Sequence, residues 1–307
     1  MMRVPAVVPL ARNMLRPLTT HAALKVDGST SGLLFSAGVI GGANLLGFTI
    51  TATTKTHKLT DLTGVGAFIL SATACAWRSG SYRTGGLRPL LLNIAVGIWG
   101  MRLASYLVQR ILKTGEDERL AAFFPQEDEG WLDRKKSLFP ANLAGFWTIQ
   151  ALWAWIVSLP VTLANFSPIR KAPFGFAGYL CTAMFAAGLT IEAIADHQKF
   201  AFKNDPNNAG KFIDSGLWAL SRHPNYFGEL VVWWSLLGIA LPVLRGPRQV
   251  ALAVSSPLSI TSLLLLVSGV PLLEKQHDRK YGSDPRYQEY KMKTPVLVPD
   301  LSKITKL

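Results

Sequence analysis

The sequence has little of what disulfide-bonded, metal-binding or nucleic-acid-binding proteins require. It contains two cysteines in 307 residues, Cys75 and Cys181, and both fall within apolar stretches. We interpret them as small apolar side chains, because no Cys/His spacing typical of a zinc site accompanies them. Acidic residues are also scarce, with 19 Asp and Glu against 32 Lys and Arg, a formal net charge of +13. The basic residues are spread over the loops without an aromatic–basic repeat, which favours a positive-inside charge balance over nucleic-acid binding.

Apolar residues, in contrast, are abundant. They make up 49% of the chain, which also contains nine Trp. A transmembrane helix needs roughly 20 predominantly apolar residues, with 17 near the lower limit. Seven stretches qualify, at about 31–53, 60–77, 87–108, 141–165, 173–194, 228–244 and 251–273. The sequence therefore predicts an all-α multipass transmembrane bundle of about seven spans, formed as one domain by residues 31–307.

The distribution of Lys and Arg predicts how this bundle is oriented. With seven spans, the loops near 54–60, 109–140 and 195–227 and the tail from residue 274 share one side. That side holds 20 Lys and Arg, and the opposite side holds 11. The positive-inside rule places the richer side toward the cytosol or a matrix-like compartment.

The first 30 residues form a separate basic segment. They include four Lys and Arg but no acid before Asp27. This pattern resembles a mitochondrial presequence, and a plain basic tail is equally compatible with it. We therefore expect an integral membrane protein of either the endoplasmic reticulum or a mitochondrial membrane.

The most informative polar segment is 221–229, with the sequence Ser-Arg-His-Pro-Asn-Tyr-Phe-Gly-Glu directly before an apolar run. Pro224 suits the first turn of a helix. A helix beginning there would place Asn225 and Glu229 on one face, four residues apart. Its unpaired backbone N–H groups and positive dipole end, next to Arg222, would form an anion-binding site. A polar cap that anchors the helix at the interface is the alternative interpretation.

Two further polar patterns lie within the predicted spans. Arg102, Tyr106 and Arg110 follow i, i+4, i+8 spacing and form one stripe along a helix. An arginine at membrane depth costs several kcal/mol unless it faces a polar cavity or a partner. Snorkelling to the interface is the alternative for Arg110.

Glu192, Asp196, Lys199 and Lys203 likewise share one helix face at i, i+4, i+7 and i+11. They form either an ion-paired helix end or part of a ligand site. The short interval to Arg222 favours the site.

The C-terminal tail contains Glu274, His277, Tyr281, Tyr287 and Tyr290. Tyrosines near an interface commonly form an aromatic belt, and a tail that packs back over a cofactor would use the same residues. His277 has no second His at metal-ligand spacing, so we interpret it as a surface or phosphate-facing residue and assign no metal ligand.

A longer series of segments occurs in order along the chain: Asp61, Arg102-Leu103 with Tyr106 and Arg110, Gly115-Glu116-Asp117 with Arg119, Phe146-Trp147 with Gln150, Ser158-Leu159-Pro160, Ile191-Glu192-Ala193 with Asp196, Gln198-Lys199, Gly216-Leu217-Trp218, Arg222 to Glu229, Ser268-Gly269 and Pro271-Leu272-Leu273-Glu274. Together they resemble the multipass family named for domain of unknown function 1295, a relative of the steroid 5-alpha-reductases. The resemblance runs from about residue 61 to 299. The Arg-His-Pro-Asn-Tyr string also resembles sterol C14 and C7 reductases and, more loosely, isoprenylcysteine carboxyl methyltransferases, so it indicates the superfamily rather than the reaction.

The resemblance implies an all-helical, steroid 5-alpha-reductase-like membrane enzyme that binds NADPH in a cytosol-facing pocket of its C-terminal half. In those reductases, the residues at the positions of Asp196, Asn225 and Glu229 hold the cofactor. Lys203 stands where they have arginine, which replaces a planar fork with a point charge. The full set of expected cofactor-binding residues is Asp196, Lys199, Lys203, Arg222, His223, Asn225, Glu229, Glu274 and Tyr281.

The implied reaction is hydride transfer from the nicotinamide to an activated C=C bond of a steroid, sterol, acyl or polyprenyl lipid. Tyr106 and Tyr226 are the tyrosines nearest the polar clusters in sequence. They are candidate proton donors, because tyrosine has an ordinary pKa of about 10 and is protonated at neutral pH. Two alternatives stay open: a methyltransferase that uses S-adenosylmethionine on a membrane-embedded substrate, and a non-catalytic lipid-binding membrane protein.

Overall fold

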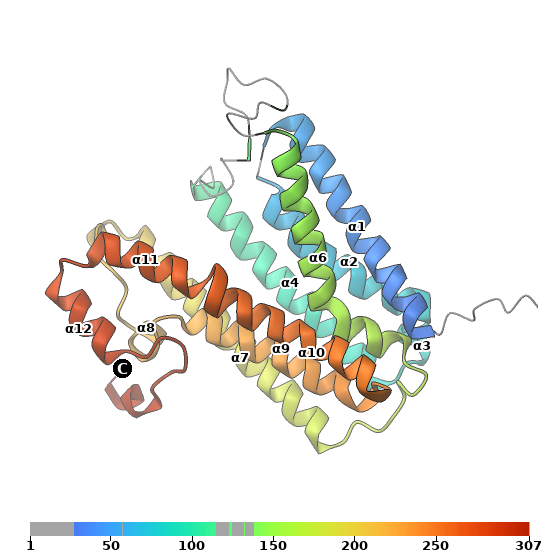
Figure 1. Cartoon of the computed structure of the whole chain (residues 1–307). Coiled ribbons are helices and arrows are strands. Elements are labelled where there is room, and N and C mark those ends of the chain that lie inside the picture. Colours follow the sequence, from blue (N-terminus) through green and yellow to red (C-terminus); the bar gives the residue numbers. More distant parts are fainter. Residues whose placement is uncertain (1–27, 57, 115–122, 125–131, 133–137, 307) are drawn as a thin grey trace, which may run out of the picture.

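The computed structural model, shown in Figure 1, describes residues 28–56, 58–114, 123–124, 132 and 138–306. All regular structure within these ranges is helical. The α-helices are α1 (Gly28–Thr54), α2 (Thr60–Ser79), α3 (Ser81–Thr84), α4 (Leu87–Thr114), α6 (Ala141–Phe166), α7 (Phe176–Asn204), α8 (Leu217–Leu220), α9 (Pro224–Ala240), α10 (Gly246–Ser262), α11 (Val270–Tyr281) and α12 (Pro285–Lys293). Short 3-10 turns cover Pro206–Asn208, Leu241–Val243 and Leu301–Lys306, and a π-helical turn, Leu263–Val267, joins α10 to α11.

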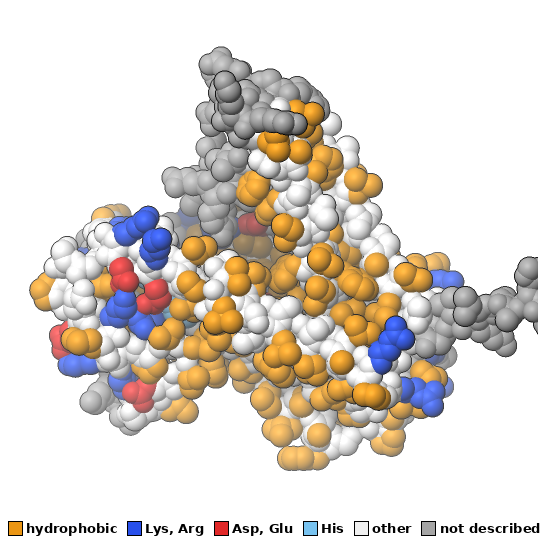
Figure 2. Space-filling model, in the orientation of Figure 1, with side chains coloured by type: hydrophobic (Ala, Val, Ile, Leu, Met, Phe, Trp, Pro, Cys, Tyr) orange, Lys and Arg blue, Asp and Glu red, His pale blue; other side chains and the backbone are white. Residues whose placement is uncertain are grey.

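Within the described ranges, six helical segments are long and apolar enough to cross a membrane. They are Gly28–Thr54, Leu87–Lys113, Ala141–Phe166, Phe176–Asn204, Pro224–Val243 and Gly246–Tyr281. Hydrophobic side chains cover most of the visible bundle surface in Figure 2, while charged side chains gather over α11 and α12 and near the opposite end of the bundle. The predicted fold class, a multipass transmembrane helical bundle, is confirmed.

Helix α2 is less apolar than these six but also crosses the bundle. At its C-terminal end the carbonyl of Ser79 accepts a hydrogen bond from Arg170 at 3.3 Å. At its N-terminal end Asp61 forms an ion pair with Arg110 of α4 at 2.6 Å. Because these partners belong to opposite ends of the bundle, α2 extends along the six candidate spans, and the predicted number of about seven is roughly consistent with this arrangement.

Buried hydrogen bonds join the connections at the α3 end. The guanidinium of Arg88 is 2% exposed. It donates to the carbonyl of Ile239 at 2.6 Å and to that of Pro173 at 2.9 Å. Ile239 lies in the last turn of α9, where the negative end of the helix dipole stabilises a cation. These contacts join the start of α4, the α6–α7 connection and the end of α9.

Helices α7 and α9 form the closest helix pair around the polar interior. A Cβ atom on Gly228 would lie 2.6 Å from the carbonyl oxygen of Gly188 and 2.8 Å from the amide nitrogen of Glu192. Only glycine permits such an approach, as is common between membrane helices. The contact places the first two turns of α9 directly against the row of charged residues on α7.

An aromatic cluster closes the bundle beside this pair. The ring centroids of Trp99 and Trp233 are 4.9 Å apart, and that of Phe68 lies 5.3 Å from Trp99 and 5.7 Å from Trp233. Both tryptophans are about 1% exposed. Phe68 and Trp233 both pack edge to face on Trp99, and the buried indole N–H groups require acceptors.

Candidate functional site

Two carboxylates of α7 bind one arginine of α4 inside the bundle. Asp196 Oδ2 accepts a hydrogen bond from Arg102 Nη1 at 2.6 Å, and Glu192 forms an ion pair with the same guanidinium. Glu192 and Asp196 are 5% and 6% exposed. An arginine at this depth needs such partners, so the partner that the sequence requires for Arg102 is found on α7.

Helix α9 completes this arrangement. It begins at Pro224, as predicted, and places Asn225 Nδ2 3.2 Å from Asp196 Oδ1. One turn later, Glu229 accepts hydrogen bonds from Trp99 Nε1 at 3.1 Å and Trp233 Nε1 at 2.8 Å. We name Arg102, Glu192, Asp196, Asn225 and Glu229 the inner polar cluster.

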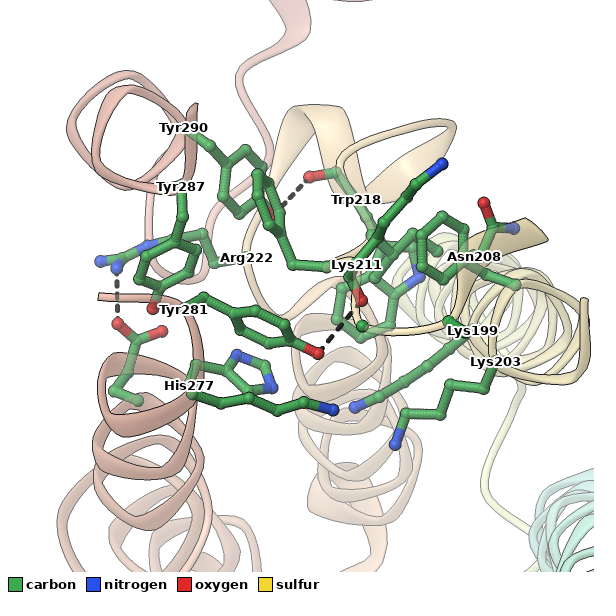
Figure 3. Close-up of a pocket in the computed structure, with 17 residues that line it drawn as sticks. Lys199, Lys203, Asn208, Lys211, Trp218, Arg222, His277, Tyr281, Tyr287 and Tyr290 are labelled. Carbon is green, nitrogen blue, oxygen red and sulfur yellow. Dashed lines mark hydrogen bonds and ion pairs between the residues drawn. The ribbon is translucent and has the colours of Figure 1, made fainter. Parts of the chain in front are cut away.

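A cavity of about 310 Å³ lies beyond the inner polar cluster, between the C-terminal part of α7 and α11 (Figure 3). This volume is at the lower end of the range for small-molecule sites. We name it the basic cavity, and its walls come from α7, the 208–213 connection, α8, α11 and α12. The lining residues are Lys199, Phe202, Lys203, Asn208, Ala209, Gly210, Lys211, Phe212, Ile213, Trp218, Arg222, Glu274, His277, Lys280, Tyr281, Tyr287 and Tyr290.

Positive charge dominates the lining of the basic cavity. The lining contains Lys199, Lys203, Lys211, Lys280 and Arg222. Glu274 is the one acid among the described lining residues, and its two oxygens already bind Arg222 Nη1 at 2.5 Å and His223 Nε2 at 2.8 Å. The remaining cations suit a ligand that carries several phosphate charges.

Aromatic side chains form the other part of the wall. The ammonium of Lys199 lies 4.8 Å from the Trp218 ring centroid. Tyr281 Oη donates to the carbonyl of Lys211 at 3.1 Å, and Tyr290 Oη donates to that of Trp218 at 2.7 Å. These bonds fix the tyrosines in place, and Figure 3 shows them around the same space as Lys199 and Lys203.

Tyr287 and Tyr290, which line the basic cavity, lie outside the membrane-spanning segments and are held in the neutral form. Burial raises the pKa of Tyr290. Burial also raises the pKa of Tyr287, and its hydrogen bond to the Asp278 carboxylate at 3.1 Å raises it further. Both phenols therefore act as hydrogen-bond donors over the neutral pH range.

Two chain segments connect residues of the inner polar cluster to residues that line the basic cavity. On α7, Lys199 lies three residues after Asp196 and therefore on the same helix face. Before α9, Arg222 lies three residues ahead of Asn225. The two groups of residues are therefore neighbours on the same elements, although no member of the inner polar cluster lines the cavity.

The structure separates the expected cofactor-binding residues into two groups and a link. Lys199, Lys203, Arg222, Glu274 and Tyr281 line the basic cavity, whereas Asp196, Asn225 and Glu229 belong to the inner polar cluster. His223 is 1% exposed, binds Glu274 of the basic cavity and lies two residues before Asn225 of the inner polar cluster.

The two candidate proton donors lie beside these groups. Tyr226 stacks on the His223 ring at 5.5 Å with an interplanar angle of 8°. Tyr106 packs against Phe200 of α7 with ring centroids 6.4 Å apart. Their catalytic role stays a prediction.

Several lining residues were absent from the sequence prediction. Lys211 and Phe212 belong to a connection without periodicity, so no pattern pointed to them. Lys280 could have been found, because it follows His277 by three residues on the same helix. The 115–119 segment of the predicted pattern lies outside the described residues. Within the described ranges, no group of three or more His, Cys, Asp or Glu side chains could hold a metal ion.

The sequence matches one protein family over most of its length and several individual proteins over shorter stretches. The family described as "Protein of unknown function (DUF1295)" matches residues 47–294. The Delta(14)-sterol reductase erg24B of Aspergillus fumigatus is 27% identical over 165 residues, which cover 42% of this chain and 32% of that protein. The Delta(14)-sterol reductase of Ascobolus immersus is 34% identical over 86 residues, covering 24% and 19%.

A relative of another class matches a shorter stretch. The probable O-methyltransferase ustE of Ustilaginoidea virens is 41% identical over 64 residues, which cover 20% of this chain and 22% of that protein. These matches span less than a third of each relative's length. No solved structure matches the chain.

Proposed function

Because this chain belongs to the DUF1295 family, and because the relatives include sterol reductases, we propose that it is a membrane reductase that uses NADPH to reduce an activated C=C bond in a sterol-like lipid. The observation that carries the proposal is that the lining residues Lys199 and Arg222 of the basic cavity each lie three residues from a member of the inner polar cluster, Asp196 and Asn225. A nucleotide site in contact with water and a polar group at membrane depth are the two requirements of such an enzyme.

The lining of the basic cavity fits the chemistry of NADPH. Lys199, Lys203, Lys211 and Lys280 offer ammonium groups for the pyrophosphate and the additional ribose phosphate. Aromatic side chains, among them Phe212 and Tyr281, line the same cavity and supply apolar surface for the base. When bound, NADPH supplies a hydride to one carbon of the C=C bond, and a proton from a protein acid completes the reduction.

The inner polar cluster would orient the reacting end of this site. Asn225 and Asp196 are linked at 3.2 Å, so each fixes the rotamer of the other. Glu229 is held by two indole N–H groups, which fix its carboxylate between α4 and α9. Tyr106 and Tyr226 remain the predicted proton donors, because each lies beside this cluster.

Direct binding measurements test the proposal. We expect the purified protein in detergent to bind NADPH more tightly than S-adenosylmethionine, because the basic cavity carries an excess of cations. Asn225→Ala removes the hydrogen bond to Oδ1 of buried Asp196, a loss of about 1–3 kcal/mol, and should weaken NADPH binding accordingly. Arg222→Ala should weaken NADPH binding more than NADH binding if Arg222 contacts the additional phosphate.

The methyltransferase alternative rests on the similarity to ustE. Binding of S-adenosylmethionine without NADPH, lost in Asn225→Ala, would establish that alternative and reject the reductase. Binding of neither ligand would favour a non-catalytic lipid-binding protein.

A further inference from the structure

The segment that follows α12 runs antiparallel to the residues that precede α9. The amide of Asp300 donates to the carbonyl of Leu220 at 2.9 Å, and the amide of Arg222 donates to the carbonyl of Pro295 at 2.9 Å. We name residues 294–300 the C-terminal strap. It binds backbone groups immediately ahead of the Arg222-to-Asn225 segment, although more than 70 residues separate the two in sequence.

Ser221 lies at the centre of this contact. Its hydroxyl donates to the carbonyl of Leu297 at 2.8 Å and accepts from the amide of His223 at 3.1 Å. The residue is 0% exposed. One hydroxyl thus fastens both the strap and the turn that leads into α9.

Arg222 is consequently held from two directions. The strap binds its amide, while Glu274 of α11 binds its guanidinium at 2.5 Å. The side chain can point into the basic cavity only while the backbone keeps this position. Loss of the Ser221 hydroxyl would leave the buried His223 amide and the partly buried Leu297 carbonyl without that partner, and the turn would shift to recover hydrogen bonds.

We propose that Ser221 is a positioning residue, which acts through the C-terminal strap to hold Arg222 and His223 in the geometry that binds the cofactor. This inference deepens the proposed function and rests on it for its affinity readout. A second readout, the local hydrogen exchange of the 218–226 backbone, needs no cofactor.

Ser167 provides a matched control at the other end of the bundle. Its hydroxyl donates to the distant carbonyl of Val243 at 2.6 Å and accepts from the amide two residues on, that of Ile169, at 3.2 Å. It is 1% exposed. Ser167→Ala therefore removes an equivalent pair of hydrogen bonds, one buried and one partly buried, far from the basic cavity.

The affinity test compares the two alanine variants in detergent. We expect Ser221→Ala to raise the Kd for NADPH about tenfold and Ser167→Ala to change it by less than about twofold, with similar losses in Tm. Equal effects of the two variants on Kd would overturn the proposal, because they would show a general loss of stability.

A double-mutant cycle with Arg222→Ala separates positioning from an independent contribution. If Ser221 acts through Arg222, Ser221→Ala should weaken NADPH binding by less than about twofold in the Arg222→Ala background. An undiminished, additive effect would contradict the proposal.

Hydrogen exchange distinguishes failure of this inference from failure of the proposed function. Without cofactor, Ser221→Ala should accelerate amide exchange within 218–226 and leave the α6–α7 connection unchanged. If the wild-type protein does not bind NADPH but this acceleration is observed, the proposed cofactor is wrong, whereas the role of Ser221 in holding the 218–226 backbone is supported. Unchanged amide exchange within 218–226 would show that Ser221 does not hold this backbone and would overturn the proposal. Should Ser221→Ala not accumulate, Asp300→Pro removes the amide that binds Leu220, with Asp300→Ala as its control.

Discussion

At the scale of single residues, two arginines of α4 show how depth sets the strength of an ion pair. Arg102 and its partners Glu192 and Asp196 have side chains that are 18%, 6% and 9% exposed. Arg110 and its partner Asp61 are 32% and 38% exposed. A buried pair leaves an uncompensated charge when one partner is removed, whereas an exposed pair is replaced by water.

We therefore expect unequal losses from two equivalent substitutions. Arg102→Ala should destabilise the protein by about 3–5 kcal/mol, because two carboxylates lose their cation. Arg110→Ala should cost less than about 1 kcal/mol. Denaturant unfolding in the same detergent measures both, and equal losses would show that the carboxylates of α7 do not depend on Arg102.

Tyr287 and Tyr290 of α12 predict that the stability of the protein decreases at alkaline pH. The pKa values of Tyr287 and Tyr290 are raised above the ordinary value of about 10. The fold favours the neutral phenols, so this contribution to stability is complete below pH of about 10 and is lost as pH rises toward the folded-state values. In a pH titration followed by tyrosinate absorbance, these two tyrosines should ionise at higher pH than the other tyrosines. The double variant Tyr287→Phe, Tyr290→Phe should lack this high-pH phase. Persistence of the phase would contradict the assignment.

At the scale of elements, the close contact between α7 and α9 positions the inner polar cluster. This contact is close because Gly188 of α7 and Gly228 of α9 each lie against the backbone of the other helix. Sequence reasoning located the start of α9 from Pro224 and the charged face of α7 from its spacing. The apolar span ends near residue 194, but the helical spacing of the charged residues extends to Lys203, and α7 indeed continues to Asn204. The sequence could not identify the partners of these last turns, because those partners lie on α4 and α8 and are remote in sequence.

A glycine pair tests this contact. In Gly228→Ala the new methyl group would meet the Gly188 carbonyl at 2.6 Å, so α7 and α9 must separate and Asn225 must move away from Asp196. We expect a Tm several degrees lower and weaker NADPH binding. Gly97→Ala, on α4 with no atom within 4 Å of its added Cβ, should leave both unchanged or slightly raise Tm.

At the scale of the whole molecule, the bundle separates a hydrogen-bonded end around Arg88 from an end that carries the basic cavity. The charge asymmetry of the sequence predicts that the second end faces the cytosol or matrix, where soluble nucleotides are found. The sequence indicated the residues of both clusters but not their separation into two groups, since that depends on how α7, α9 and α11 cross.

Topology can be measured with single cysteines at Ser215 and Ser302, both exposed, in a background without Cys75 and Cys181. We expect a membrane-impermeant reagent to label both positions from the same side of the membrane, because both belong to the segments at the end of the bundle that carries the basic cavity. Labelling from opposite sides would exclude a shared cavity.

The most direct test of the central claim compares two neighbouring lysines of α11. Lys280 lines the basic cavity, whereas Lys275, on the same helix, does not. Loss of one charge-assisted phosphate contact corresponds to about a tenfold weaker affinity. The account predicts that Lys280→Gln raises the Kd for NADPH by this factor and that Lys275→Gln leaves it within about twofold of wild type. Equal Kd values for the two variants would contradict NADPH binding in the basic cavity.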